Sequence, residues 1–518
     1  MSSPTPIADD ELDTAIDWFD PTLNDSQQGA IRFALASRDV ALIHGPPGTG
    51  KTHTLIELIQ QCLRRGQRLL VCGPSNISVD NIVERLASKK IPMVRLGHPA
   101  RLLPGVLNHS LEVLTKTSEA AAIVSDVRTE MDAKQASIRK TRNGREKRSI
   151  YGEIKELRKE YRQREGRVVS DLLRSSKVVL CTLHGAGGYH LKNERFDVVI
   201  VDEASQALEA QCWIPVLASS APKLVLAGDH LQLPPTIKSL NSKAAKKTKP
   251  KAESDATDAA NGIAGMKLKH DESTLETTMF DRLLELHGTK LKRMLTTQYR
   301  MHEQIMAFPS SALYENKLIA ADSVKSRLLK DLEYEVQATD DTQEPLVFWD
   351  TQGGDFPEQT EEDDEAGPKS KSRLLAESKV NEHEAAIVQM HLGSLIDAGV
   401  QAEDIAIVTP YNGQLALLSG MLKDKYPGLE LGSVDGFQGR EKEAIIVSLV
   451  RSNPEHEVGF LAEKRRLNGK WTCTKPLCGP VQHCMSEIEH LKLTGYTVAM
   501  TRPKRHLCII GDSETVGR

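Results

Sequence analysis

Short apolar runs recur along the chain, and segments with helical spacing of apolar residues separate them. The runs expected to form strands are Val40–His44, Leu69–Cys72, Val178–Cys181, Val198–Val201, Leu224–Ala227, Ile405–Val408 and Ile445–Val450. Helices are expected over Thr52–Arg64 and Asp80–Leu86. Strands that are apolar at every position are buried on both faces, and intervening helices are typical of parallel sheets. The pattern predicts an α/β fold with enough strands for two parallel sheets.

Residues 99–171 interrupt this pattern with a long charged region that lacks strand signals and is expected to be helical. Within it, residues 139–167 carry 12 Lys and Arg against 5 Glu, a clear excess of positive charge. Two interpretations remain open. The segment is either a solvated pair of helices or a surface that contacts a phosphate backbone.

Two further segments contain almost no large apolar residues. Residues 238–275 are rich in Lys, Ala and Ser, and residues 353–371 contain an acidic run at 361–365. Segments of this composition cannot bury enough apolar surface to fold. We expect both to be disordered surface loops.

Length and composition narrow the class of protein. The 518 residues exceed the ~250–300 at which single hydrophobic cores stop growing, so at least two domains are expected. With 39% hydrophobic and 27% charged residues the composition is globular, and no apolar run approaches the ~18–20 residues of a membrane span. The acidic N-terminus resembles no secretory signal, and eight cysteines are too few for a disulfide framework, which favours an intracellular location. Because the net charge is −4, affinity for nucleic acid would have to come from a local basic surface.

A phosphate-binding pattern lies between the first expected strand and the first expected helix. Gly45-Pro46-Pro47-Gly48-Thr49-Gly50-Lys51-Thr52 matches G-x-x-x-x-G-K-[ST]. Glycines allow backbone amides to turn toward a phosphate at the N-terminus of a helix. Lys51 is expected to reach the β- and γ-phosphates of ATP, and Thr52 is expected to ligate Mg²⁺.

A nucleotide site of this kind needs a carboxylate at the end of a second strand. Asp202 and Glu203 directly follow the expected strand Val198–Val201. Asp202 is expected to hold the Mg²⁺, and Glu203 to orient and deprotonate the attacking water. Together with the phosphate loop, the pair predicts an enzyme that hydrolyses nucleoside triphosphates.

Five further strings stand in order along the chain: Leu23–Gln27, Gly228–Pro235, Gln298–His302, Val434–Glu441 and Val498–Arg502. With the two motifs above, they resemble the motifs of superfamily 1 helicases of the up-frameshift-like group, in the branch of immunoglobulin mu-binding proteins and fungal DNA helicase A. The resemblance extends from Leu23 to Asp512. It implies two tandem RecA-like P-loop domains. Residues 1–98 and 172–288 would form the first, with 99–171 as a helical insertion, and residues 289–518 the second.

The resemblance implies roles for three residues around the nucleoside. Gln27 would read the adenine edge, Tyr299 would stack on the base, and Glu441 would contact the ribose. The alternative for Tyr299 is a buried side chain with no ligand.

It also implies three residues around the γ-phosphate. Gln232 would sense this phosphate and link hydrolysis to the nucleic-acid groove. Arg300 and Arg502 would act as arginine fingers from the second domain, because a guanidinium can bind two phosphate oxygens at once. A structural ion pair is the alternative for either arginine.

Short polar side chains at strand ends suit phosphate contacts that do not depend on base sequence. By the same resemblance, the residues expected to line a groove for single-stranded nucleic acid are Pro74, Ser75, Asn76, Asn81, Thr182, Thr409, Pro410, Tyr411 and Asn412.

The resemblance has three departures. Relatives place a small β-barrel domain before Leu23, where this chain has 22 residues, and they continue with a further helix beyond Arg518, so we expect both parts to be absent. The third departure is an insert. Arg465–Asn468 should run directly into Val498–Arg502, but residues 469–497 lie between them.

The insert contains three cysteines and one histidine, namely Cys473, Cys478, His483 and Cys484. These side chains could ligate zinc, although their spacing is not that of a usual zinc knuckle. Alternatively, Gly469-Lys470-Trp471 can be encoded with a splice donor, and Thr497-Val498 with an acceptor. Removal of the span would rejoin Asn468 to a valine codon, so we interpret residues 469–497 as a retained intron translated in frame.

The leading hypothesis is an ATP-dependent helicase or translocase that acts on single-stranded DNA or RNA as a monomer. The resemblance implies 5′→3′ movement. One alternative is a nucleic-acid-stimulated ATPase that remodels complexes without unwinding, and another is an inactive product that only binds nucleic acid. Backbone and stacking contacts do not choose between DNA and RNA, and either would place the protein in the nucleus or the cytoplasm.

Overall fold

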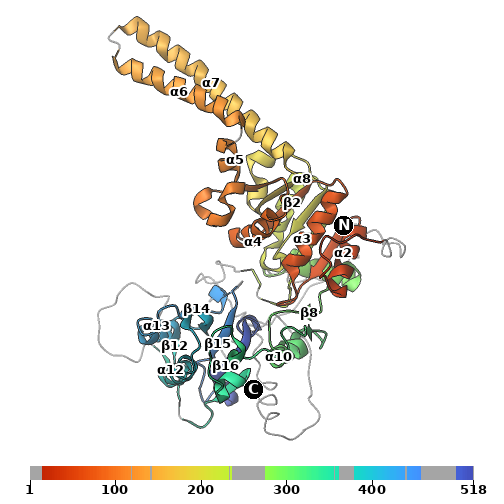
Figure 1. Cartoon of the computed structure of the whole chain (residues 1–518), viewed down its shortest axis with the longest axis vertical. Coiled ribbons are helices and arrows are strands. Elements are labelled where there is room, and N and C mark those ends of the chain that lie inside the picture. Colours follow the sequence, from red (N-terminus) through yellow and green to blue (C-terminus); the bar gives the residue numbers. More distant parts are fainter. Residues whose placement is uncertain are drawn as a thin grey trace, which may run out of the picture.

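The computed structural model describes residues 15–117, 119–140, 143–232, 234–235, 275–354, 356–360, 378–437, 440–456 and 497–516. Two α/β domains lie one after the other along the molecule, and a helical arm projects from the first (Figure 1). The expectations for residues 238–274, 361–371 and 469–496 concern residues outside the described part. None of the described helices is both long and apolar enough to cross a membrane.

A seven-stranded parallel sheet forms the first domain, in the order β3-β4-β2-β5-β6-β1-β7. Its strands are β1 (Val40–His44), β2 (Leu69–Gly73), β3 (Met93–Leu96), β4 (Val178–Thr182), β5 (Val198–Val201), β6 (Lys223–Gly228) and β7 (Lys292–Met294). The helices α2 (Asp25–Ala36), α3 (Lys51–Arg64) and α4 (Asn76–Ala87) cover one face, and α8 (Glu209–Ser219) and α9 (Met279–His287) cover the other. Because both faces are covered, the central strands β2, β5 and β6 are buried along their whole length.

Five of these strands form where the apolar runs predicted them, whereas β3 and β7 were not expected. Arg95 interrupts β3, and β7 begins with two basic residues, so neither segment has the apolar pattern of a buried strand. β7 pairs with β1 and lies beyond residue 288, where the sequence had placed the domain boundary. The first domain therefore extends to Met294.

A five-stranded parallel sheet forms the second domain, in the order β10-β16-β15-β13-β14. Its strands are β10 (Leu346–Asp350), β13 (Ile405–Thr409), β14 (Glu430–Ser433), β15 (Lys442–Ser448) and β16 (Pro503–Gly511). α10 (Glu303–Leu313) packs on one face, and α12 (Glu382–Asp397) and α13 (Asn412–Leu422) pack on the other. The smaller elements are β8 (Thr297–Gln298), β9 (Ile319–Ala320), α11 (Asp340–Gln343), β11 (Gln359–Thr360), β12 (Lys379–Val380), α15 (Thr497–Met500) and α16 (Ser513–Val516).

The projecting arm is an antiparallel pair of helices, α6 (Glu119–Lys140) and α7 (Gly144–Ser175), preceded by α5 (Leu111–Thr117). A small apolar cluster joins the two helices, formed by Val127, Met131, Ile154 and Leu157. At the base of the arm, Leu173 lies in the core of the first domain. With 32 residues, α7 is ~48 Å long, so most of it lies outside that domain.

Candidate functional site

The phosphate-binding loop connects β1 to α3. Gly48 and Gly50 have φ angles of 73° and 75°, which glycine adopts without the steric cost that a Cβ would bring. A Cβ on Gly48 would lie 2.7 Å from Cβ of Arg300, and one on Gly50 would lie 2.5 Å from Nε2 of Gln27. No side chain caps the N-terminus of α3, so its first backbone amides are available to an anion.

Lys51 lies between the two carboxylates that follow β5. Its Nζ forms a short ion pair with Oε1 of Glu203 and lies 3.7 Å from Oδ1 of Asp202. Burial opposes the charge of Lys51, but the two carboxylates outweigh it and raise the pKa of the amine. Burial also raises the pKa of Asp202, although Lys51 opposes this shift. The structure thus brings together the three side chains that the two motifs predicted.

Glu203 has an unusual backbone and a partner that the sequence did not reveal. Its φ of 53° and ψ of 38° lie in the left-handed region, which is costly for a residue with a Cβ. Gln206 donates from Nε2 to Oε2 of Glu203 over 2.8 Å, while Lys51 holds the other oxygen. The carboxylate is therefore oriented from both sides.

Gln27 and Tyr299 meet at the same loop although they are far apart in sequence. Gln27 is buried, and its Nε2 donates to the carbonyl of Thr49 over 3.2 Å. Tyr299 is 42% exposed and is not a core residue, and its amide donates to the carbonyl of Gly48 over 2.8 Å. Asn24 links the two: its amide nitrogen donates to Oε1 of Gln27, and its Nδ2 donates to the hydroxyl of Tyr299.

The arginines of the second domain differ in how well they are paired. Arg300 donates from Nε to Oε2 of Glu441 over 2.8 Å, so Glu441 is engaged by this arginine. Arg502 is 6% exposed and donates from Nη2 to Oε1 of Gln232 over 3.3 Å, whereas its Nε has no acceptor among the described residues. Burial and the neighbouring Arg300 lower the pKa of Arg502 to about 10. A buried guanidinium with an unused donor fits a triphosphate.

Of the first-domain residues expected at a nucleic-acid groove, Pro74 and Ser75 follow β2, Thr182 ends the adjacent strand β4, and Asn76 and Asn81 lie in α4. Asn81 is exposed, and Pro74 and Thr182 are half-buried. Ser75 caps α4 by accepting from the amide of Ser78 over 3.1 Å.

Asn76 is held by Arg95, a residue that the sequence did not single out. Nη2 of Arg95 donates to Oδ1 of Asn76 over 3.0 Å, and Nε of Arg95 pairs with Asp80 over 2.7 Å. Arg95 and Asp80 are both buried, so the ion pair is a fixed support beneath Asn76.

In the second domain, the structure corrects part of the expected groove. Thr409, the last residue of β13, is fully buried, and Tyr411, two residues beyond it, packs in the core with only 9% exposure. Their side chains are not available to a strand at the surface. Pro410 is half-buried and Asn412 is exposed, so the surface positions of this segment alternate with its buried ones.

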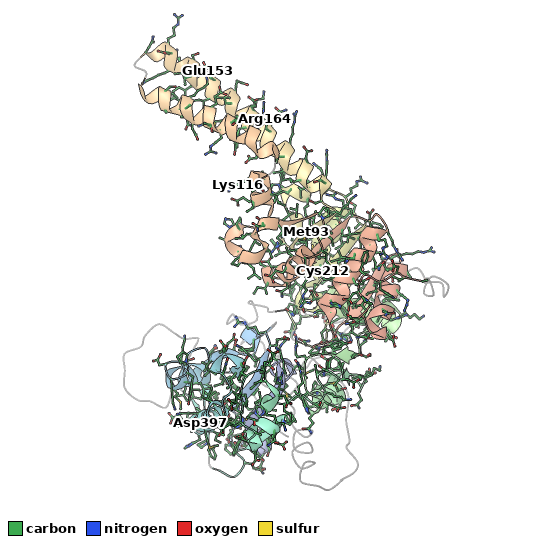
Figure 2. All side chains as sticks on the ribbon, in the orientation of Figure 1. Met93, Lys116, Glu153, Arg164, Cys212 and Asp397 are labelled. Atoms are coloured by element: carbon green, nitrogen blue, oxygen red, sulfur yellow. The ribbon has the colours of Figure 1, made fainter. Side chains whose placement is uncertain are left out.

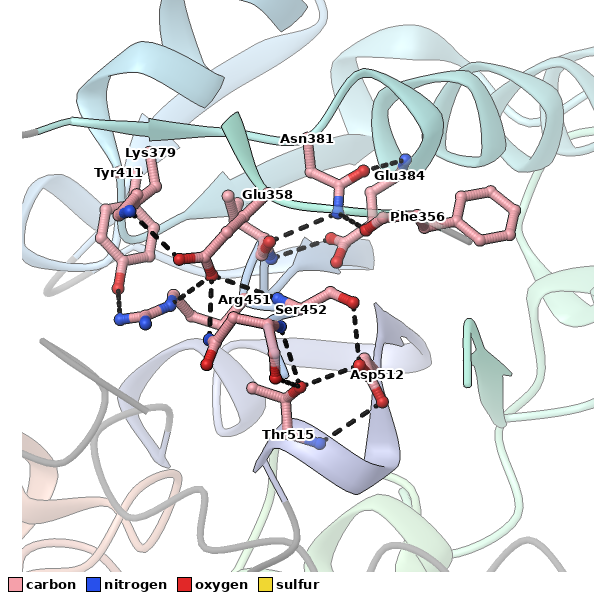
Figure 3. A network of polar contacts seen from close by, with 12 residues as sticks. Phe356, Glu358, Lys379, Asn381, Glu384, Tyr411, Arg451, Ser452, Asp512 and Thr515 are labelled. Atoms are coloured by element: carbon pink, nitrogen blue, oxygen red, sulfur yellow. Dashed lines mark hydrogen bonds and ion pairs between the residues drawn. The ribbon is translucent and has the colours of Figure 1, made fainter. Parts of the chain in front are cut away.

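Tyr411 instead belongs to the polar network shown in Figure 3, where its hydroxyl accepts from Nη1 of Arg451 over 3.4 Å. Glu358 accepts from Nε of Arg451 over 2.6 Å and pairs with Lys379 over 3.1 Å. These contacts join β12 to the segments that follow β13 and β15, so they stabilise the chain at the carboxyl ends of two inner strands of the second sheet.

Comparison with known proteins places this site in a family. Two family models, each described as an AAA domain, match residues 22–240 and 275–478. An uncharacterized ATP-dependent helicase of Methanocaldococcus jannaschii is 31% identical over 542 residues, which cover 96% of this chain and 69% of that protein. The chain therefore belongs to the ATP-dependent helicases of superfamily 1, in their up-frameshift-like group. Membership implies the use of ATP.

Within this group, the chain is similar to two eukaryotic proteins. The DNA polymerase alpha-associated DNA helicase A of Schizosaccharomyces pombe is 48% identical over 508 residues, covering 98% of this chain and 66% of that protein. The DNA-binding protein SMUBP-2 of Rattus norvegicus is 44% identical over 503 residues, covering 96% of this chain and 44% of that protein. The chain thus spans less than two thirds of the length of each of these relatives.

Proposed function

We propose that this chain is an ATP-dependent helicase or translocase that moves 5′→3′ along single-stranded DNA or RNA. The observation that carries the proposal is the position of Arg502. This buried guanidinium comes from the second domain, contacts Gln232 of the first, and keeps one donor without an acceptor among the described residues. A γ-phosphate held by the loop of the first domain would supply that acceptor, and its hydrolysis would remove it.

The residues of the first domain divide the chemistry of hydrolysis between them. Lys51 and the amides of residues 45–52 hold the phosphates, and Gln27 and Tyr299 hold the adenine. Asp202 and Thr52 would hold Mg²⁺, which neutralises charge on the phosphates when it is bound. Glu203, oriented by Lys51 and Gln206, takes a proton from the attacking water.

The residues of the second domain complete the site. Arg300 and Arg502 act on the developing charge of the γ-phosphate. Arg300 must exchange its bond to Glu441 for one to the phosphate, which leaves Glu441 available to the ribose. Closure of the two domains on ATP is thus coupled to an exchange of ion pairs.

The arm offers a second surface for nucleic acid, because one of its grooves is lined by four cations and a single carboxylate, Glu156. Lys155, Arg158, Lys159 and Arg162 line a groove with the 60%-exposed Tyr151, and none of these four cations forms an ion pair within the described part of the arm. A neighbouring groove is lined mainly by acidic residues, of which Glu153 pairs with Lys134 and Glu160 with Arg164. Figure 2 labels Glu153 and Arg164 on the arm. An unpaired basic groove with an exposed aromatic ring suits a phosphate backbone and a stacked base.

Two relatives are named for DNA, which favours DNA as one substrate and supports a location in the nucleus or the cytoplasm. Its activity can be tested with the purified chain. We expect ATP hydrolysis that needs Mg²⁺ and increases with a single-stranded oligonucleotide, and unwinding of a duplex with a 5′ overhang but not of one with a 3′ overhang. Stimulated hydrolysis without unwinding would favour a remodelling ATPase. Binding of the oligonucleotide without hydrolysis would favour an inactive product.

A further inference from the structure

A buried carboxylate at the end of β6 joins four groups from both domains. Asp229 is 2% exposed. Its Oδ1 accepts from Nε2 of His44 over 2.9 Å and from the amide of Leu231 over 3.2 Å. Its Oδ2 accepts from Nε2 of Gln232 over 2.6 Å and from the hydroxyl of Tyr314 over 2.7 Å. Burial opposes the charge of Asp229, but the bonds from His44, Tyr314 and Gln232 hold its pKa below the usual range.

Of these four donors, Tyr314 is the one that comes from the second domain. Its ring is 2% exposed and belongs to the core cluster of that domain. The next two residues, Glu315 and Asn316, have φ angles of 54° and 56°, and the amide of Asn316 bonds back to the carbonyl of Ser310 in α10. This tight turn fixes the tyrosine to the second domain, while its hydroxyl reaches into the first.

The carboxylate of Asp229 is connected to the phosphate site in two ways, through His44 and through Gln232. His44 is the last residue of β1 and directly precedes Gly45 of the phosphate loop. Gln232 donates to Asp229 and accepts from Arg502 over 3.3 Å. The path from Tyr314 through Asp229 and Gln232 to Arg502 therefore begins and ends in the second domain and crosses the first between them.

We infer that Tyr314 is a positioning residue whose hydroxyl, through Asp229, orients Gln232 and Arg502 for hydrolysis when the two domains are closed. This inference rests on the proposed function. Three of the four donors to Asp229 belong to the first domain and do not depend on where the second domain lies. The fourth, the hydroxyl of Tyr314, can bond only when the second domain is in this position. Without it, Oδ2 of Asp229 keeps a single donor, the amide of Gln232, and this side of the carboxylate loses its restraint from the second domain.

The test is Tyr314→Phe, which removes one oxygen and leaves the ring in the core. We expect the kcat of ATP hydrolysis in the presence of a single-stranded oligonucleotide to fall by about tenfold or more, since hydrogen bonds to charged groups are of this strength and small misplacements of catalytic groups are costly. The KM for ATP should change by no more than about twofold, because the hydroxyl of Tyr314 bonds to Asp229 and not to Gln27 or Tyr299. In a Gln232→Ala background, Tyr314→Phe should cause no further loss, because the pathway is already cut.

Tyr334→Phe is a matched control. The hydroxyl of Tyr334 donates to Oδ2 of Asp404 over 2.6 Å, so this variant also removes a tyrosine–aspartate bond, but one in which neither residue belongs to the proposed nucleotide site. Its kcat should equal that of the wild type. Equal losses in the two variants would overturn the inference, and so would an unchanged kcat in Tyr314→Phe or independent, multiplying losses with Gln232→Ala.

A measurement without turnover separates this inference from the proposed function. Wild-type protein that neither hydrolyses ATP nor responds to nucleic acid would contradict the proposed function. Affinity for ADP with aluminium fluoride, a mimic of the transferred phosphate, can still be compared with affinity for ADP alone. We expect Tyr314→Phe to weaken the first by about tenfold and to leave the second unchanged. Equal affinity of the variant and the wild type for the mimic would overturn the inference.

Discussion

Arg300 of the second domain packs directly on Gly48 of the phosphate-binding loop. The two residues are so close that a Cβ on the glycine would lie 2.7 Å from Cβ of the arginine. The backbone amide of Tyr299 donates to the carbonyl of the same glycine. The phosphate-binding loop is therefore in contact with the first segment of the second domain. The two parts of the proposed catalytic site are joined by a bond between backbone groups, in addition to their side-chain contacts.

Replacing Glu203 with Gln should separate ATP binding from ATP hydrolysis. The amide has the shape of the carboxylate but cannot take a proton, so we expect turnover to fall by at least ~10²–10⁴-fold while ATP still binds. Lys51→Ala, by contrast, should weaken ATP binding itself. Steady-state hydrolysis and equilibrium binding of a fluorescent ATP analogue measure the two effects. Near-normal turnover in Glu203→Gln would show that another group activates the water.

Reversing the charge of the basic groove on the arm should weaken the binding of single-stranded nucleic acid. With Lys155, Arg158, Lys159 and Arg162 all changed to Glu, the slope of log affinity against log salt should decrease by ~0.7 for each phosphate that the groove no longer neutralises. Binding is measured by fluorescence anisotropy over a series of salt concentrations. An unchanged slope would mean that the groove is a solvated surface.

The acidic groove of the arm provides the matched control for that experiment. Changing Glu130, Glu153 and Glu160, which do not line the basic groove, to Lys alters the charge of the same arm with the opposite sign. This variant should bind nucleic acid at least as tightly as the wild type. Equal weakening in both variants would point to damage to the fold of the arm and not to weaker binding of phosphate by the groove.

Deleting residues 469–497 should increase nucleic-acid-stimulated ATP hydrolysis by at least tenfold. The deletion restores a direct connection from Asn468 to Val498, which would restrain the loop that carries Arg502, and a displacement of ~1 Å at such a group can cost ~10²-fold. Loop closure costs grow only slowly with length, so the undeleted chain is still expected to fold. Zinc should not affect the undeleted protein. Stoichiometric zinc, together with loss of activity on deletion, would identify the insert as a metal-binding module.

The stability of the second domain should depend on pH through Glu384. Burial raises the pKa of this carboxyl group to about 8, although the hydroxyl of Ser448 and the amide of Val450 donate to its Oε2. Because this value lies above the unfolded value of ~4.3, the folded protein binds one more proton between the two. The contribution of Glu384 to the free energy of unfolding is therefore largest at pH ~4.3 and below, and decreases as the pH rises toward 8.

The corresponding variant is Glu384→Gln, which cannot ionise and matches the shape of the protonated acid. The difference in urea midpoint between Glu384→Gln and the wild type should therefore grow from pH 5 to pH 8, by up to ~1.4 kcal/mol in unfolding free energy for each pH unit. A difference that does not change with pH would show that Glu384 is ionised in the folded protein throughout.

The nucleotide site could be predicted from the sequence because each of its parts follows from local chemistry. Lys51, Asp202 and Glu203 occupy fixed positions after apolar strands, and parallel strands bring their carboxyl ends to one edge. Tyr299 and Arg300 came from a resemblance and not from a pattern of spacing. The structure nevertheless places both against the loop, through contacts that no local signal in the chain encodes.

What could not be predicted depends on long-range packing. A search for apolar runs does not predict an arginine in a buried strand. Arg95 nevertheless lies in one, because Asp80 and Asn76 supply partners for its guanidinium. Tyr411 follows a strand end, as a groove residue would, but Arg451 and the core draw its ring inward. In both cases a partner distant in sequence outweighs the local pattern.

The described chain passes from one domain to the other through Leu295 and Thr296, the two residues between β7 and β8. Both are held by the first domain, since the amide of Leu295 donates to the carbonyl of His44 and that of Thr296 to the hydroxyl of Ser26. If the second domain rotates when it closes on ATP, as proposed, the axis would therefore pass a few residues before Arg300. In a rigid rotation, groups close to the axis, such as Arg300, move little, whereas groups far from the axis in the same domain move a long way. A small displacement around the γ-phosphate would thus accompany a much larger displacement at the edge of the second sheet that is farthest from the axis.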